Sequence, residues 1–178
     1  MTPPMTKAEE PVPLAILDVQ YTGDEARAAV VVAARWTDKA PVEEHVTLVQ
    51  DVKPYQPGAF FERELPCLLA ALALVQAEVR AIVIDGYVDL DEHGKPGLGG
   101  HLHAHLKGAI PVVGVAKTAF RGSAFATPVL RGTSRNPLFV TARGVDVALA
   151  ADLVRRMHGA HRIPTLLQRT DHIARGRR

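Results

Sequence analysis

Residues 81–86 read Ala-Ile-Val-Ile-Asp-Gly, an unbroken apolar run that stops at a carboxylate and a glycine. A short apolar run with a turn at its end is typical of a strand buried on both faces of a parallel sheet. A second run, Pro111–Ala116, has the same character and stops at Lys117. Because ligands bind at the carboxyl ends of parallel strands in open α/β sheets, both strand ends are candidate site positions.

Three strands are predicted upstream, at Leu14–Tyr21, Ala26–Trp36 and Glu44–Val52, with short turns between them. Three consecutive strands joined in this way indicate an antiparallel meander. Asp18 lies in the middle of the first strand among apolar neighbours, where a carboxylate is unfavourable unless it is paired or bound to a metal. Asp18 is therefore a candidate functional residue.

Helices are predicted between and after the two buried strands. Leucine and valine recur at steps of three and four from Leu65 to Val79, which indicates an amphipathic helix with Pro66 in its first turn. The remaining elements are predicted as helices at Gly99–Lys107 and Val145–His158, a helical segment after Ile163-Pro164, a short strand at Leu138–Thr141, and loops at 87–97 and 118–137, the second long or an irregular hairpin.

This order of elements is that of the ribonuclease H-like fold, an α/β fold with a mixed five-stranded sheet flanked by helices. Three strands of the sheet are antiparallel and two are parallel. In that fold the middle of the first strand lies beside the end of the fourth, so Asp18 should face Asp85. With 178 residues and no internal repeat, we expect a disordered tail at 1–12, a single domain at 13–175 and a basic tail at 176–178.

The charge distribution is lopsided although the net charge is only +2. Residues 1–116 carry 9 basic and 16 acidic side chains, whereas residues 117–178 carry 12 and 3. This asymmetry predicts an anionic partner for the C-terminal half, with nucleic acid first. The alternative is a solvated face whose arginines pair with the acidic half.

Other features of the composition indicate where the protein acts. No apolar run approaches the ~18 residues of a membrane span, and the N-terminus lacks a signal-peptide pattern. Cys67 is the only cysteine, so an intrachain disulfide is excluded and a reducing compartment is indicated. We expect a cytoplasmic monomer that does not contact membranes.

Carboxylates that converge at a sheet edge can hold Mg²⁺ or Mn²⁺ and leave positions open for water and phosphate. A cation so placed can orient a nucleophilic water, polarise the phosphate and stabilise the leaving oxygen. The candidate ligands are Asp18, Glu64, Asp85 and Asp171. Asp85 could instead begin a turn with Gly86, and Glu64 and Asp171 taken singly are equally open to a structural role.

Two other groups have both a functional and a structural interpretation. The ammonium of Lys117 could bind the scissile phosphate or neutralise charge that develops in the transition state, or it could reach solvent. His101, His103 and His105 alternate, but on the predicted helix only the first and the last share a face. An incidental histidine-rich segment is therefore favoured over a zinc site.

Residues 54–64, Pro-Tyr-Gln-Pro-Gly-Ala-Phe-Phe-Glu-Arg-Glu, mix features that a connecting loop does not need. Two prolines stiffen the backbone around Tyr55, and Gly58 permits a turn or a close approach to a ligand. An aromatic ring is thus presented at low entropic cost. The simpler interpretation is a stiff loop with a surface tyrosine and with Glu64 near a helix N-terminus.

The segment Pro54–Gly58 with Arg63-Glu64 resembles the signature of the endonuclease V family, nucleases that nick nucleic acid near deaminated purines. Further stretches resemble the family in the same order and extend the similarity over residues 14–172. They are Asp18-Val19, Ile84-Asp85-Gly86, residues 99–102 leading to 111–117, and residues 136–140 followed by Arg162-Ile163-Pro164 and Asp171.

The resemblance implies a Mg²⁺-dependent endonuclease, with Mn²⁺ as a substitute, that acts in DNA repair. It implies cleavage on the 3′ side of deoxyinosine or a related lesion, displaced by one nucleotide. Asp18 and Asp85 would be metal ligands assisted by Glu64 and Asp171, and Lys117 would contact phosphate. Tyr55 would fill the gap left when the damaged base is flipped out of the helix. The remaining implied substrate-binding residues are Pro57, Gly58, Gly86 and Ala116, around a pocket for hypoxanthine.

The chain also departs from the family. It lacks most of the helix that usually precedes the first strand and is trimmed between Arg121 and Asn136. Where the family has His or Asn, then Gly and a basic stretch, residues 87–92 read Tyr-Val-Asp-Leu-Asp-Glu. This leaves base specificity open. The alternatives are a structure-selective or RNA-directed nuclease on the same fold, or a nucleic-acid-binding module without turnover. Whether Asp171 or His172 reaches the metal is also open.

Overall fold

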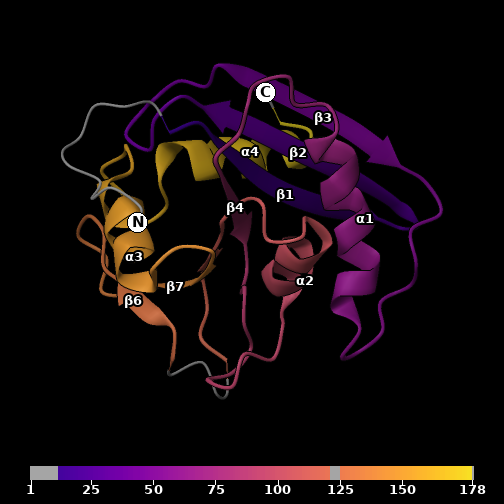
Figure 1. Cartoon of the computed structure of the whole chain (residues 1–178). Helices are drawn as coiled ribbons and strands as arrows, with labels where there is room; N and C mark the ends of the chain where they lie inside the picture. The colour runs from indigo at the N-terminus through magenta and orange to yellow at the C-terminus, as the bar shows by residue number, and fades with distance from the viewer. Residues whose placement is uncertain (1–11, 121–124, 178) are drawn as a thin grey trace.

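The computed structural model describes residues 12–120 and 125–177, and within them the strands form one mixed sheet (Figure 1). The sheet has seven strands in the order β3-β2-β1-β4-β5-β7-β6. The strands are β1 (Leu14–Thr22), β2 (Glu25–Ala33), β3 (Glu43–Val49), β4 (Ala81–Asp85), β5 (Val112–Ala116), β6 (Thr127–Val129) and β7 (Leu138–Arg143). The helices are α1 (Phe60–Leu72), α2 (Leu98–His105), α3 (Val147–Arg156) and α4 (Thr165–Ala174).

The register of the central strands brings the first two candidate carboxylates together. β1 pairs antiparallel with β2 and parallel with β4, and Leu17 lies opposite Ile84 in the parallel pair. The next residue on each strand is Asp18 or Asp85, so the two side chains are neighbours. β4 pairs parallel with β5, with Asp85 opposite Val115. The prediction that Asp18 faces Asp85 is confirmed.

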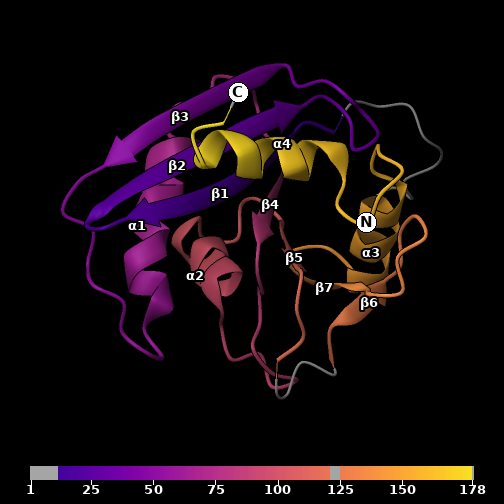
Figure 2. The same ribbon diagram turned by 180° about the vertical axis from the view of Figure 1, so that it is seen from behind.

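The two faces of the sheet are covered by different helices. α1 and α2 lie on one face and α3 and α4 on the other, as the two opposite views show (Figures 1 and 2). Along β1, Leu17 packs towards α1 and α2, whereas Leu14 and Ile16 pack towards α3 and α4. Because side chains alternate along a strand, Asp18 belongs to the second face, where α4 presents Asp171.

The predicted five-stranded sheet is wrong in strand number. The predicted loop at 118–137 contains β6, and the predicted strand at Leu138–Thr141 extends to Arg143 as β7. β7 pairs antiparallel with β5 and with β6, which adds two strands at that edge. β6 is short and includes Pro128, which only an edge strand tolerates, so its sequence signal is weak. Residues 121–124 of the predicted loop, 1–11 of the predicted tail and 178 lie outside the described residues.

The helix predicted from Leu65 to Val79 is displaced. α1 begins at Phe60, so Pro66 lies inside the helix, and Glu64 lies beyond its first turn. α1 ends at Leu72 because the chain finds other hydrogen bonds: the backbone N–H groups of Gln76 and Ala77 donate to the carboxylate of Glu43 at 3.0 and 2.7 Å. The apolar residues at 75 and 79 then pack on the same core from an irregular segment.

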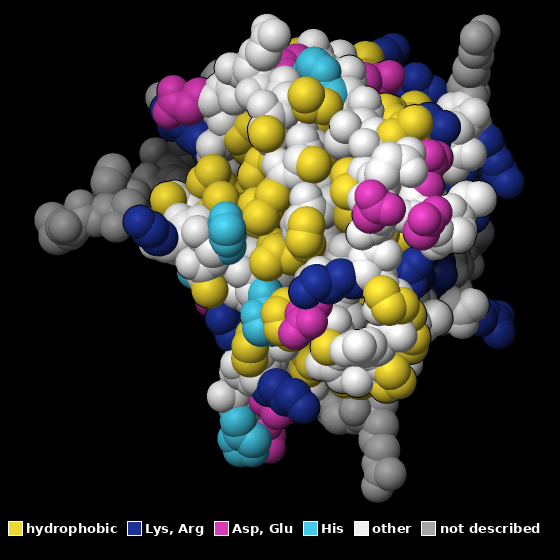
Figure 3. Space-filling model, turned by 90° about the vertical axis from the view of Figure 1, so that its right-hand side faces the viewer, with side chains coloured by type: hydrophobic (Ala, Val, Ile, Leu, Met, Phe, Trp, Pro, Cys, Tyr) yellow, Lys and Arg dark blue, Asp and Glu magenta, His cyan; other side chains and the backbone are white. Residues whose placement is uncertain are grey.

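The basic C-terminal half places many of its arginines in contacts within the protein. Four carboxylates and several backbone carbonyls accept them. The ion pairs are Arg143–Asp89, Arg155 and Arg156 with Asp152, Arg169–Glu44 and Arg175–Asp171. On the face shown in Figure 3, basic and acidic side chains are interspersed around apolar ones. The asymmetry of the sequence therefore reflects internal pairing as well as any anionic partner. In the described part of the chain, no helix is long and apolar enough to cross a membrane.

Candidate active site

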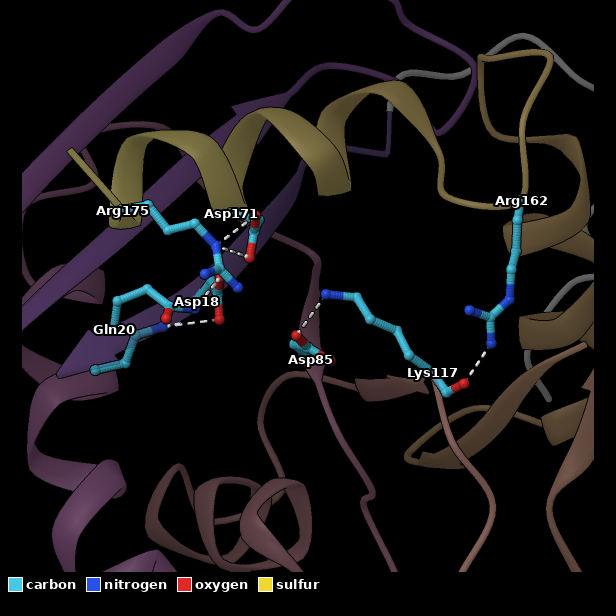
Figure 4. A network of polar contacts seen from close by, with 8 residues as sticks. Asp18, Gln20, Asp85, Lys117, Arg162, Asp171 and Arg175 are labelled. Atoms are coloured by element: carbon cyan, nitrogen blue, oxygen red, sulfur yellow. Dashed lines mark hydrogen bonds and ion pairs between the residues drawn. The ribbon is translucent and has the colours of Figure 1, made fainter. Parts of the chain in front are cut away.

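Four of the predicted site residues line one recess where β4 and β5 end beneath α4. They are Asp18, Asp85, Lys117 and Asp171. Figure 4 shows Asp18 below Asp171, with Asp85 and Lys117 on the other side of the opening. The recess is completed by Ile16, Leu17, Val115, Leu138, Ile163, Leu167 and Thr170. The recess includes Asp171 and not its neighbour His172, which favours Asp171 as the residue that reaches the site.

The three aspartates differ in their partners. Asp18 is only 8% exposed, and its carboxylate accepts hydrogen bonds from the N–H of Val19 at 2.9 Å and from Gln20 Nε2 at 3.4 Å. Asp85 accepts a hydrogen bond from Lys117 Nζ at 3.0 Å. Asp171 is held one helical turn from Arg175, whose Nε donates at 2.9 and 3.0 Å to its two oxygens. The most buried carboxylate thus has the weakest partners.

Glu64 approaches this group from α1, on the other face of the sheet. Its side chain is 8% exposed, and its buried Oε2 has no hydrogen-bond donor among the described residues. Burial first, and then the charges of Asp18 and Asp85, raise the pKa of Glu64 to about 8. Burial and the charge of Asp85 likewise raise the pKa of Asp18 to about 6. Ionising all of these carboxyls together is therefore unfavourable in the metal-free protein.

This donor set suits a divalent cation. Hard cations take carboxylate oxygens, and mutual repulsion between carboxylates is relieved when a cation lies between them. As the side chains stand, no three acidic, histidine or cysteine side chains of the described residues lie close enough together to hold one ion. Asp85 is engaged by Lys117 and Asp171 by Arg175, so a cation would have to compete with these two basic groups.

Lys117 remains an ammonium in this setting. Partial burial disfavours its charge, but the charge and hydrogen bond of Asp85, with smaller contributions from Asp171 and Asp18, raise its pKa above the ordinary value. Asp171 shows the complementary behaviour. Burial alone would raise its pKa, yet the hydrogen bond from Arg175 and the charge of Lys117 hold that pKa below the ordinary value.

Tyr55 lies outside the carboxylate recess, on the segment that leads into α1. Its side chain is 58% exposed and meets the ring of Phe60 edge-on, with centroids 6.0 Å apart. Gly58 has a φ of +82°, which allows the turn that follows Pro57. A second recess lies along this segment, lined by Lys53, Pro54, Gln56, Ala59, Glu62 and Arg63. The segment connects to the active site through α1, which carries Glu64.

The two other predicted pocket residues lie at strand ends. Gly86 follows Asp85 with a φ of +133°, and its N–H donates to the carbonyl of Val115 at 3.1 Å. Ala116 is buried at the end of β5. Both flank the recess in the sequence, and their contact with a base stays a prediction.

The unusual stretch at 87–92 is tied to neighbouring segments. The hydroxyl of Tyr87 donates to the carbonyl of Thr118 at 2.7 Å, and Asp89 accepts from Arg143 Nε at 2.8 Å. Part of the acidity of this stretch is therefore neutralised within the protein. On α2, His101 stacks on Phe61 with centroids 3.5 Å apart, which is a packing role.

Sequence reasoning missed the partners of the carboxylates. Gln20 and Arg175 follow Asp18 and Asp171 at spacings of two in a strand and four in a helix, which place side chains on one face. These spacings could have revealed both contacts. Arg162, which donates to the carbonyl of Lys117, has no such local signal, because its partner is far away in the sequence.

The raised pKa values predict how stability depends on pH without metal. The folded state holds the protons of Asp18 and Glu64 more tightly than the unfolded state. The stability that these protons contribute is therefore fully present below the ordinary carboxyl pKa, and it is lost as pH rises through the raised pKa values of the folded state. We expect the Tm of the metal-free protein to fall between about pH 5 and about pH 9, by the equivalent of a few kcal/mol. Thermal melts in a chelator measure this.

Glu64→Gln should remove much of that slope and stabilise the metal-free protein at the alkaline end. Glu62→Gln is the matched control, because Glu62 lies on the same helix and makes only a 3.8 Å, largely exposed ion pair with Lys53. If Tm depends on pH in both variants as it does in the wild type, Glu64 is not the group that binds the proton.

Comparison with known proteins agrees with this geometry. Residues 5–138 match the sequence model of the Endonuclease V family. Endonuclease V of Xanthomonas axonopodis pv. citri is 33% identical over an alignment of 184 positions that covers 90% of this chain and 76% of that protein. The crystal structure of endonuclease V from Streptomyces avermitilis superposes with a TM-score of 0.73 at 29% identity, covering 94% of this chain and 82% of that one.

A further solved structure extends the likeness of the fold. Endonuclease V of Ciona intestinalis, crystallised with a 23-nucleotide DNA that contains an inosine followed by a ribo-adenosine, superposes with a TM-score of 0.80 at 19% identity. The superposition covers 94% of this chain and 85% of that one. The strand count differs from the expected five, but the architecture is the same ribonuclease H-like one. The chain belongs to the endonuclease V family, a family of nucleases.

Proposed function

We propose that this protein is a divalent-metal-dependent endonuclease that nicks DNA on the 3′ side of deoxyinosine, displaced by one nucleotide, in the repair of deaminated purines. Mg²⁺ is the proposed cofactor and Mn²⁺ a substitute. The observation that carries the proposal is the shared recess of Asp18, Asp85, Lys117 and Asp171, with Glu64 buried and electrostatically coupled to it. The inosine-containing DNA held by the Ciona intestinalis relative supports the choice of substrate. We also propose that it acts as a monomer in the cytoplasm.

The carboxylates have distinct tasks in this proposal. Asp18 and Asp85 would hold the cation, assisted by Glu64 and Asp171, and the bound cation would supply Lewis acidity at the phosphate and a more acidic water. Asp18 is fixed by the N–H of Val19 and by Gln20, which makes it the rigid member of the set. Asp85 is 38% exposed and free to exchange Lys117 for another partner.

Lys117 would then bind the scissile phosphate. In the protein alone its ammonium neutralises Asp85 at 3.0 Å. When phosphate enters, the same ammonium can donate to a phosphate oxygen and stabilise negative charge that grows in the transition state. Lys117 and Asp85 neutralise one another before binding. After binding, the phosphate would neutralise Lys117 and the cation would neutralise Asp85.

Tyr55, Pro57 and Gly58 would act on the damaged base, together with Gly86 and Ala116. Flipping a base out of a duplex costs a few kcal/mol, and an inosine mispair opens more easily than a normal pair. Tyr55 is exposed on a stiff segment, so its ring can stack in the gap that the extruded base leaves. The backbone at Gly58, Gly86 and Ala116 would line the pocket for hypoxanthine.

Tyr55→Ala should therefore impair nicking of an inosine-containing duplex, by the equivalent of roughly 1–3 kcal/mol of lost stacking. The loss should be smaller with an inosine-containing single strand, where little stacking is broken. Tyr55→Phe should be nearly silent, because the ring and not the hydroxyl carries the effect. Nicking of both substrates by the three proteins at one stated salt concentration measures this. Equal losses on the two substrates would show that Tyr55 only shapes its loop.

One substrate panel tests the proposed function as a whole. Duplexes and single strands of DNA and RNA that contain inosine, uracil, an abasic site or no lesion are incubated with the protein and Mg²⁺, Mn²⁺ or a chelator. Metal-dependent nicking confined to inosine-containing DNA is the expected result. Faster cleavage of RNA would make the protein an RNA-directed nuclease, lesion-independent cleavage a structure-selective nuclease, and binding without cleavage a binding module.

A further inference from the structure

Arg162 connects segments that each contribute residues to the lining of the recess. It lies in the loop between α3 and α4, and its guanidinium reaches back to the end of β5 (Figure 4). Its Nε donates to the carbonyl of Asn136 at 2.9 Å, and its Nη2 donates to the carbonyls of Pro137 at 3.0 Å and of Lys117. One planar group therefore ties the end of β5 and the start of β7 to the loop that leads into α4.

The loop that carries Arg162 is itself held from inside. Arg131 is 5% exposed, and its guanidinium donates to backbone carbonyls at the end of α3 and along this loop. The acceptors are Arg155 at 3.4 Å, Met157 at 2.6 Å, Gly159 at 3.0 Å, His161 at 2.7 Å and Arg162 at 3.2 Å. A loop wrapped around a buried cation in this way is a firm base, so the side chain of Arg162 projects from a fixed point.

Both sides of the connection belong to the recess. Directly after Arg162 come Ile163 and then α4, which contributes Leu167 and Asp171 to the recess wall. On the other side Lys117 contributes its ammonium, bound to Asp85. We propose that Arg162 is a positioning residue that sets Lys117 against the carboxylates by holding the end of β5 to the loop before α4. This inference rests on the proposed nuclease function for its catalytic consequence.

The three hydrogen bonds from the side chain at position 162 require the planar guanidinium of an arginine. A guanidinium presents several N–H donors in a rigid plane, whereas an ammonium is a compact charge on a flexible stem. Lysine at position 162 would keep the charge near Lys117 but could not bridge three carbonyls from two segments. Arg162→Lys therefore separates the loss of the bridge from the loss of the charge.

Nicking kinetics of Arg162→Lys on an inosine-containing duplex test the proposal. We expect kcat to fall about tenfold or more because Lys117 is displaced, while the Kd for the duplex changes about twofold at most. Arg169→Lys is the matched control, since Arg169 lies on α4 and donates at 2.7 and 2.8 Å to Glu44 on the surface. This control should keep the kcat of the wild type.

A double-mutant cycle distinguishes positioning from general damage. In a Lys117→Ala background, Arg162→Lys should lower kcat by no more than about twofold, because the group that it positions is gone. If the fold-reductions in kcat from the two substitutions multiply in the double mutant, or if Arg162→Lys alone leaves kcat unchanged, Arg162 does not act through Lys117. Thermal melts of all four proteins verify that each is folded.

A second measurement does not require catalysis, so it separates this inference from the proposed function. Limited acetylation followed by mass spectrometry gives the reactivity of Lys117 relative to the exposed Lys39. In the wild type Lys117 should react severalfold more slowly than Lys39, because its ammonium lies 3.0 Å from Asp85 and its side chain is only 38% exposed. Arg162→Lys should raise the ratio towards one, and Arg169→Lys should not. An unchanged ratio in Arg162→Lys would overturn the positioning role even in a protein that nicks nothing.

Discussion

Asp85→Asn is expected to abolish metal-dependent nicking of inosine-containing DNA while the protein stays folded. The substitution preserves the shape of the side chain but removes the negative charge from the recess beside Asp18. An amide is a poorer ligand for a hard cation than a carboxylate, and Lys117 loses the partner that holds it at 3.0 Å. A gel assay over a range of Mg²⁺ and Mn²⁺ concentrations measures the loss. Full Mg²⁺-dependent activity in this variant would rule out the proposed role of Asp85.

The stability of the same variant gives a second, independent expectation. The charge of Asp85 raises the pKa of both Asp18 and Glu64, so its removal relieves repulsion in the metal-free protein. The lost ion pair with Lys117 is 38% exposed on each side and contributes about 0–1 kcal/mol at most. Tm without metal should therefore hold or rise. Asp152→Asn, which removes two exposed ion pairs on α3, is the control and should keep full activity.

The positions of the candidate residues that the structure bears out are those set by local rules. Buried strands are visible as apolar runs, and the residues that end them, Asp85 and Lys117, are visible with them. Parallel pairing then fixes that these ends meet at one edge of the sheet, and the register places Asp18 beside Asp85. Asp171 has a weaker signal, because a single acid on a helix is equally open to a structural role and only the resemblance to the family adds weight to it.

The parts that the sequence does not predict depend on contacts between distant segments. α1 ends early because Glu43, more than thirty residues upstream, accepts hydrogen bonds from the backbone that follows the helix. β6 exists because β7 offers it an edge, although three residues with a central proline would not form a strand alone. Arg131 and Arg162 look like surface cations in the sequence, yet both are surrounded by carbonyls.

The contacts of the arginines in the C-terminal half change the interpretation of the charge asymmetry. An excess of arginine in the C-terminal half suggests an anionic partner, but Arg131 and Arg162 donate to backbone carbonyls and so organise loops. The basic side chain that lines the recess is that of Lys117, which is a single residue at a strand end. Function is therefore better inferred from where each charge lies than from the number of charges.

Lys117→Ala should lower kcat far more than it weakens DNA binding. One preorganised donor aimed at developing charge contributes about a hundredfold or more to kcat, whereas one exposed phosphate contact contributes mainly salt-dependent affinity. Lys117 is half-buried, faces Asp85 within the recess and retains its charge because its pKa is raised. These properties suit a group that acts on the transition state. Single-turnover nicking rates and Kd values at several salt concentrations separate the two contributions.

Two comparison variants make this measurement decisive. Lys39→Ala removes an exposed cation between β2 and β3 and should change neither kcat nor the salt dependence of Kd. Lys117→Arg keeps the charge but enlarges the head group, and should recover only part of the rate because a planar guanidinium does not reproduce the compact ammonium that moves from Asp85 to the phosphate. If Lys117→Ala alters only the affinity and its salt dependence, with kcat unchanged, Lys117 belongs to the general binding surface and the recess acts through its carboxylates alone.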